Sequence, residues 1–228
     1  MRGGFGPQRI LSRLGQDMKI AYITGIPGSG KTTLETNLRV QTGARQTTYE
    51  ELSLSRDGQI AFIGRTSKKN GKPIKYAGLD AYDGKTEDLL DWMRNLGGQG
   101  VKYAVFSGIR DFKKYVPSMA EYGFGYGIFF NVKTPEKILQ YRNKRREKSA
   151  IPKEVELERI RKEVERLEGK IALWERLQNK HPESIKVHVL QGSTMNRIES
   201  VLNYLDRKHD RSLRIIRKHH SERYRAKP

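Results

Sequence analysis

The chain has 228 residues, and its 45 Lys and Arg outnumber 26 Asp and Glu, which gives a formal net charge of +19. It contains no cysteine, which excludes disulfides and cysteine-based metal sites or nucleophiles. No apolar run approaches the roughly 18 residues of a membrane-spanning helix, so we expect neither secretion nor membrane insertion but a cytoplasmic protein. The charge indicates an anionic partner larger than one nucleotide, although a generally basic soluble protein would show the same imbalance.

A glycine-rich segment near the start carries the strongest functional signal. Residues 25–33 match the phosphate-binding pattern G-x-x-x-x-G-K-[ST], after a predicted strand at 20–24 and before a predicted helix at 31–40. In such loops backbone N–H groups converge on phosphates at a helix N-terminus. The sequence therefore predicts a nucleoside triphosphate site, with Lys31 on the β- and γ-phosphates and the Thr32 hydroxyl on Mg²⁺. The predicted binding residues are Gly25, Gly28, Ser29, Gly30, Lys31, Thr32 and Thr33.

The segments that follow predict an α/β fold. Short strands at 47–52 and 59–64, around the Asp57-Gly58 turn, suggest a hairpin beside the main sheet, and residues 65–75 read as a polar basic loop. Periodicity then predicts, in order, a helix at 87–96, a strand at 101–106, a helix at 111–122, a strand at 126–132, helices at 135–146 and 152–180, a strand at 185–190 and a helix at 198–205. This alternation predicts a three-layer fold with a mainly parallel five-stranded sheet.

We divide the chain into an N-terminal extension (1–17), one catalytic domain (18–205, with a helical lid at about 142–152) and a basic C-terminal tail (206–228). The tail holds nine Lys or Arg and three Asp or Glu, which leaves a net +13 on residues 1–205. A basic face on the catalytic domain is therefore expected as well.

The segment 76–84 is a candidate pocket for the phosphate acceptor. It opens from a strand-like piece into a turn that contains Tyr76, Asp80, Tyr82 and Asp83. Asp80 is the preferred carboxylate to orient or deprotonate an acceptor hydroxyl, whereas Asp83-Gly84 resembles turn chemistry. A helix cap or turn is an equally good interpretation of Asp80.

The strand predicted at 101–106 ends in Ser107-Gly108, where many phosphate-loop proteins place an acid. Ser107 could hold a metal-bound water, or the metal-side acid could come from Asp80 or Asp111; the sequence leaves these open. Arg110 lies just beyond the strand end, where it could clamp an acceptor phosphate or be an exposed arginine at a helix start.

Arginines cluster at the end of the helix predicted at 135–146. Arg142, Arg145 and Arg146 occur where small phosphate-loop kinases carry an arginine lid, and guanidinium groups suit the charge of a transferring phosphoryl group. A solvated basic helix end is the alternative. We take Lys31, Asp80, Arg142 and Arg146 as the candidate catalytic residues. Tyr76, Asp80, Tyr82 and Arg110 are the candidate acceptor-binding residues.

The phosphate loop, the strand–helix order and the arginine cluster resemble the P-loop nucleoside and nucleotide kinase superfamily. Within it, Ile63-Gly64-Arg65 and Tyr76-Ala77-Gly78-Leu79-Asp80 resemble bacteriophage kinases that phosphorylate 5-hydroxymethyluracil in DNA. The resemblance implies ATP and Mg²⁺, a DNA partner, and transfer of phosphate to the base hydroxymethyl group during thymine hypermodification. It would place the protein in the cytoplasm of an infected host.

Three other functions remain open at this point. A kinase for free nucleotides would share the catalytic residues but gives no reason for the large charge. A kinase for polynucleotide ends would explain the charge. An ATP-dependent DNA-binding switch would not need an acceptor pocket. The five histidines show no metal-ligand spacing, and no metal beyond nucleotide-bound Mg²⁺ is implied.

Overall fold

Five adjacent parallel strands form most of the sheet in the computed structural model, which describes residues 18–47, 52–64, 68–69, 72–73, 86–108, 123–145, 152–210 and 212–213. In spatial order these strands are β4 (Ile60–Ile63), β7 (Tyr103–Ser107), β1 (Lys19–Thr24), β8 (Gly125–Asn131) and β9 (Ile185–Leu190). The expected strands at 20–24, 59–64, 101–106, 126–132 and 185–190 are thereby confirmed within a residue or two at their ends.

The expected count of five strands is wrong, because two short strands extend the sheet. β3 (Leu52–Leu54) pairs antiparallel with β4, and β2 (Arg45–Gln46) pairs antiparallel with β3. The hairpin predicted around Asp57-Gly58 therefore lies within the main sheet rather than beside it. The result is a mixed, mostly parallel seven-stranded sheet with β2 and β9 at its two edges.

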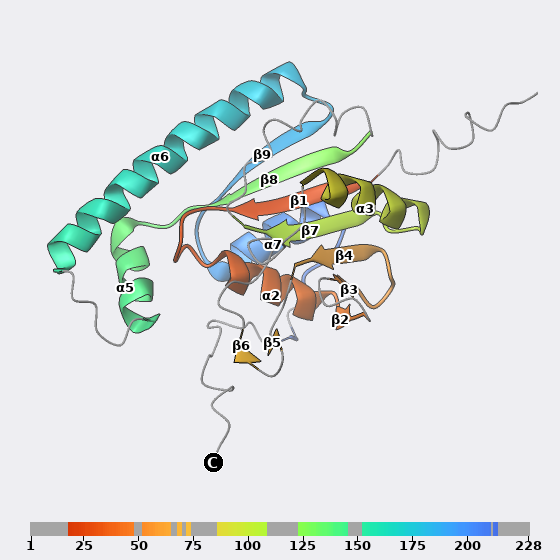
Figure 1. Ribbon diagram of the computed structural model, residues 1–228, viewed down its shortest axis with the longest axis horizontal. Helices are drawn as coiled ribbons and strands as arrows, with labels where there is room; N and C mark the ends of the chain where they lie inside the picture. The colour runs from red at the N-terminus through yellow and green to blue at the C-terminus, as the bar shows by residue number, and fades with distance from the viewer. Residues whose placement is uncertain are drawn as a thin grey trace, which may run out of the picture.

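Side chains alternate between two apolar layers along each central strand. In β1, Ile20 and Tyr22 join a cluster with residues of α3 (Thr86–Gly98) and α6 (Lys153–Lys180), whereas Ala21 and Ile23 join a second cluster with α2 (Lys31–Gln41) and α7 (Thr194–Tyr204). Because the strand buries both faces, helices cover the sheet on both sides, as an α/β fold requires. Figure 1 shows the long α6 beside β8 and β9, with α5 (Pro135–Arg145) next to its start.

β1 lies between β7 and β8. The strands that follow β1 in the chain are therefore added first on one side of it and later on the other, and the loop after β1 lies at this switch point. The register pairs Ile23 with Ser107 and Thr24 with Phe130. Residues that follow these three strands therefore share the carboxyl edge of the sheet, which is where ligands bind in open α/β sheets. The fold brings the segments after residues 24, 107 and 131 to one place.

Two local expectations differ from the structure. α7 begins at Thr194, four residues before the predicted start, because the Ser193 side chain accepts a hydrogen bond from the Asn196 N–H and caps the helix. Within the stretch read as a loop, β5 (Lys68–Lys69) and β6 (Lys72–Pro73) pair antiparallel as a small separate sheet.

The predicted extension at 1–17, the helix at 111–122 and residues 214–228 of the tail lie outside the described residues. Among the helices that the structure describes, none is both long enough and apolar enough to cross a lipid bilayer.

Candidate functional site

The predicted phosphate loop connects β1 to α2 at the carboxyl edge of the sheet. Gly25, Gly28 and Gly30 have φ values of 146°, 89° and 93°, which side chains other than glycine rarely adopt. At Gly25 a Cβ would also lie 2.8 Å from the Asn131 carbonyl oxygen, and at Gly30 one would lie 2.9 Å from Lys133 Nζ. The backbone conformation therefore favours glycine at both positions, and at Gly25 the Asn131 backbone also leaves no room for a side chain.

The N-terminus of α2 has the features of an anion site. Lys31, Thr32 and Thr33 form its first turn, which contains no acidic residue and receives no side-chain cap. Lys31 is 9% exposed, and its Nζ donates to the carbonyl oxygens of Gly25 at 2.8 Å and Ile26 at 3.2 Å. The helix dipole and the Lys31 ammonium thus favour negative charge at the same position.

Asn131, at the end of β8, ties the loop to the rest of the fold. Its Nδ2 donates to the Ser29 carbonyl oxygen at 3.1 Å, and its Oδ1 accepts from Arg197 Nη1 at 2.6 Å. Arg197 Nη2 also donates to the Val132 carbonyl oxygen at 3.0 Å. Asn131 is 1% exposed, so a side chain from α7 positions the phosphate loop through a buried amide.

Replacement of Asn131 by leucine is expected to lower the free energy of unfolding by about 1–3 kcal/mol, because a Ser29 acceptor and an Arg197 donor lose their buried partner. Urea unfolding of N131L measures this loss. The matched control is Asn203→Leu on the exposed side of α7. Equal stability of the two variants would show that Asn131 does not support the loop.

Lys133, which the sequence analysis did not single out, lies over the phosphate loop. It is half-buried, with Nζ 4.1 Å from the centre of the Tyr141 ring, and it forms no ion pair with any described residue. Burial, followed by repulsion from Arg197 and Lys137, lowers the pKa of Lys133 to about 8. A lysine that lies beside a phosphate-binding motif and pairs with no carboxylate of the described residues is suited to an anionic ligand.

Ser107 contacts a carboxylate that the sequence analysis also missed. Its Oγ donates to Oε2 of Glu35, a residue of α2 that is 4% exposed, while Arg39 donates to Glu35 Oε1 at 2.6 Å. A carboxylate at the end of β7 thus comes from α2, while Asp80 and Asp111, the sequence candidates for the metal-side acid, lie outside the described residues. Since both Glu35 oxygens accept hydrogen bonds, the carboxylate holds the Ser107 hydroxyl in place.

Arg142 contacts the phosphate loop from outside. Its Nε and Nη2 donate to the Pro27 carbonyl oxygen at 3.2 and 3.0 Å, and the same guanidinium pairs with Glu156 at 3.0 Å and Glu163 at 2.5 Å. Burial disfavours the charged form, but the hydrogen bonds to Glu163 and Glu156 outweigh it and raise the pKa of Arg142. The helix pair α5–α6 is therefore connected to the loop through one cation.

The structure brings together Lys31, Thr32, Thr33 and Arg142 around the loop, with the three glycines and Ser29. The other candidates, Tyr76, Asp80, Tyr82, Arg110 and Arg146, lie outside the described residues, as do Asp83 and Asp111. The Arg145 backbone ends α5, and its side chain is outside that description too. Within the described ranges no three His, Asp or Glu side chains are close enough to hold a metal ion.

Comparison with known proteins adds no family assignment. No protein-family model matches the chain. A search of the curated proteins gives no significant match.

Proposed function

We propose that this protein is an ATP-dependent kinase that phosphorylates the hydroxymethyl group of 5-hydroxymethyluracil in phage DNA. The observation that carries the kinase proposal is the loop 25–30, which connects a buried strand at a change of strand order to a helix that begins with Lys31. Three features there favour a polyphosphate: positive-φ glycines, an uncapped helix N-terminus and the Lys133 ammonium.

The described residues support the following roles on the donor side. Lys31 exchanges its contacts with the Gly25 and Ile26 carbonyl oxygens for the β- and γ-phosphates, and Lys133 adds a second cation. Thr32 supplies a hydroxyl to Mg²⁺, which when bound would neutralise phosphate charge. Ser107 donates a hydrogen bond to Glu35, which leaves the lone pairs of its hydroxyl oxygen to accept a hydrogen bond from metal-bound water.

On the acceptor side the roles rest on the sequence. The hydroxymethyl oxygen attacks the γ-phosphorus, the bond to the bridging oxygen breaks, and ADP leaves. Asp80 takes or orients the hydroxyl proton, and Tyr76 or Tyr82 stacks on a base held outside the duplex. Arg110 and Arg146 contribute positive charge to the phosphates.

DNA is preferred over a free nucleotide as acceptor because the net charge is +19. A polymer backbone requires contacts from Lys and Arg along its length, whereas a mononucleotide needs only a few. A kinase for polynucleotide ends is the second candidate, since the same charge would serve it.

The test follows the terminal phosphate of labelled ATP onto DNA that contains 5-hydroxymethyluracil, with thymine DNA and the free hydroxymethylated nucleotide as parallel acceptors. Label in the modified polymer alone is the expected result. Label on the free nucleotide, at polymer ends, or on no acceptor would each overturn the proposal.

Nucleotide affinity is expected to fall as pH rises through about 8, the pKa of Lys133 in the free protein. Below that pH the ammonium is present before and after binding and contributes fully. Above it the free protein has lost the proton, and binding must recover it because the triphosphate favours the charged form. Calorimetry in two buffers should show proton uptake near pH 9 but not near pH 7.

The matched variants are Lys133→Met and the exposed-site control Lys170→Met. Proton uptake should disappear in K133M and persist in K170M. Persistence of uptake in K133M would assign the titration to another group.

A further inference from the structure

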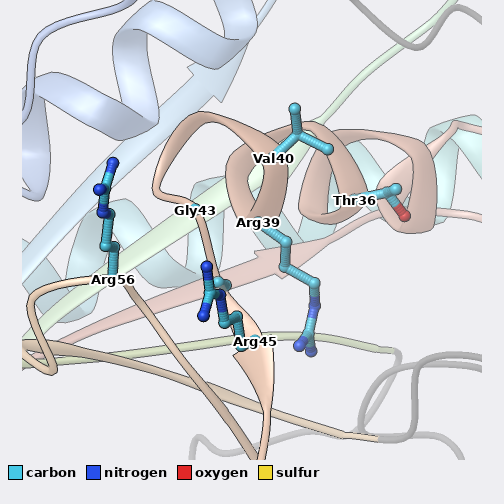
Figure 2. A pocket seen from close by; sticks show the side chains of 7 residues that line it. Thr36, Arg39, Val40, Gly43, Arg45 and Arg56 are labelled. Carbon is cyan, nitrogen blue, oxygen red and sulfur yellow. The ribbon is translucent and has the colours of Figure 1, made fainter.

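A cavity of about 450 Å³ opens beside the C-terminal half of α2, away from the phosphate loop. Three arginines line it, Arg39 from α2, Arg45 from β2 and Arg56 from the turn between β3 and β4, and none of the lining residues is acidic. Figure 2 shows the three arginines on different elements on either side of Gly43, with the Arg39 side chain pointing away from that of Arg56. We name this site the arginine pocket.

The arginine pocket has more positive charge than the described residues neutralise. Arg45 and Arg56 are exposed, and neither forms an ion pair within the described part of the chain. The acid next to Arg56, Asp57, is bound by Arg207. Arg39 pairs with Glu35 through Nε and Nη2, and its buried Nη1 forms no hydrogen bond with any described residue.

The Arg39 guanidinium is buried over the Phe62 ring, so the exposed guanidinium groups of Arg45 and Arg56 are the ones that a ligand can reach. Guanidinium groups match phosphate oxygens in geometry as well as in charge. Arg45 and Arg56 line the cavity at the β2 edge of the sheet, where an extended molecule has access to both. These properties fit consecutive phosphates of a polymer better than one small anion.

We propose that the arginine pocket binds the phosphodiester backbone of DNA. The proposal rests on the proposed function, since it assigns part of the surface that holds the polymeric acceptor. Lys31 and Arg39 lie eight residues apart on α2, or about 12 Å along the axis, which corresponds to about three to four nucleotide steps. DNA held here therefore extends past the helix that begins at the phosphate loop.

The pocket is also connected to the end of β7 by hydrogen bonds. Arg39 binds Glu35, and Glu35 accepts from Ser107, so the chain of contacts leads from the cavity to the candidate metal side of the site. Arg39 is therefore left unchanged in the test, and only the two exposed arginines are altered.

The test compares Arg45→Glu/Arg56→Glu with Lys170→Glu/Lys186→Glu in the full chain. The control pair is exposed, carries the same change of charge, and lies on α6 and on β9 at the opposite edge of the sheet. Fluorescence anisotropy of a short unmodified DNA duplex measures binding over a series of salt concentrations. An Arg45→Ala/Arg56→Ala variant and a calorimetric ATP titration accompany them.

R45E/R56E is expected to raise the dissociation constant for DNA at least tenfold, with a smaller rise in R45A/R56A. The slope of log affinity against log salt should decrease by about 2, since each phosphate contact contributes about 0.9. K170E/K186E should change the dissociation constant less than threefold, and ATP affinity should stay constant in both. Three results would overturn the assignment: equal weakening of DNA binding by the two charge-reversal pairs, no weakening of DNA binding by R45E/R56E, or loss of ATP affinity in R45E/R56E.

Because the duplex is unmodified, its binding does not depend on catalysis. If the parent protein transfers no phosphate but R45E/R56E still loses DNA binding selectively, the arginine pocket is supported and the kinase proposal is overturned. If the parent protein transfers phosphate to modified DNA and R45E/R56E changes neither this transfer nor DNA binding, the kinase proposal is supported and the arginine pocket is overturned.

Discussion

Replacement of Lys31 by alanine is expected to reduce phosphoryl transfer about 10³-fold or more, the effect of removing a preorganised charge from the transferring group. The Lys31 ammonium is held at the loop by two carbonyl oxygens, 2.8 and 3.2 Å away, and is nearly buried. Since no other described side chain takes this place at the start of α2, the variant loses the cation that meets charge as it develops. Single-turnover transfer from labelled ATP measures the loss.

The loss in K31A should appear in the rate constant more than in the fold. Two hydrogen bonds to loop carbonyls contribute about 1 kcal/mol each, so thermal unfolding should shift only modestly. Lys170→Ala, an exposed lysine on α6, is the control and should retain full activity. If K31A stays within tenfold of the parent rate, the loop does not hold the phosphate that is transferred.

Much of the fold could be predicted because strong local signals agree with one another. The segment 19–41 combines an apolar strand, positive-φ glycines and a helix whose apolar positions Leu34 and Leu38 face the core. The final strand, at 185–190, was predicted at the residues where β9 lies. Where hydrophobic period, turn residues and segment length all indicate the same element, tertiary packing does not change the local preference.

The rest of the fold depends on pairing between segments, which one sequence does not display. β2 and β3 are too short to show a period, so only the pairing of β3 with β4 and of β2 with β3 identifies them. The β5–β6 pair did have a signal, Asn70-Gly71 between two short segments, which favours a two-residue hairpin turn. The Ser193 cap likewise marks the start of α7 and was overlooked.

The same distinction holds for the candidate site. The phosphate loop is continuous in sequence and could be read directly, whereas its supports Asn131, Lys133 and Arg197 come from distant segments. Position gave one clue, because Lys133 follows the end of a predicted strand at the ligand-binding edge. For Glu35 the clue was its four-residue spacing from Arg39, but the contact with Ser107 required the fold.

Replacement of Arg142 by methionine is expected to lower the free energy of unfolding by about 3 kcal/mol, at the low end for breaking a buried ion pair. Glu156 is 3% exposed and would keep a buried negative charge without its closest cation, while Glu163 is more exposed and loses less. The Pro27 carbonyl oxygen loses its donors as well, so the loop becomes less constrained. Urea unfolding and single-turnover transfer should both respond.

The double variant R142M/E156M separates stability from phosphoryl transfer. Two apolar side chains in place of the pair remove the unpaired charge, so stability should return close to that of the parent protein. Transfer should stay low, because the contact with Pro27 and the guanidinium beside the loop are still absent. Recovery of both properties would make Arg142 a support of the helix pair alone, whereas recovery of stability alone assigns it to the phosphate site.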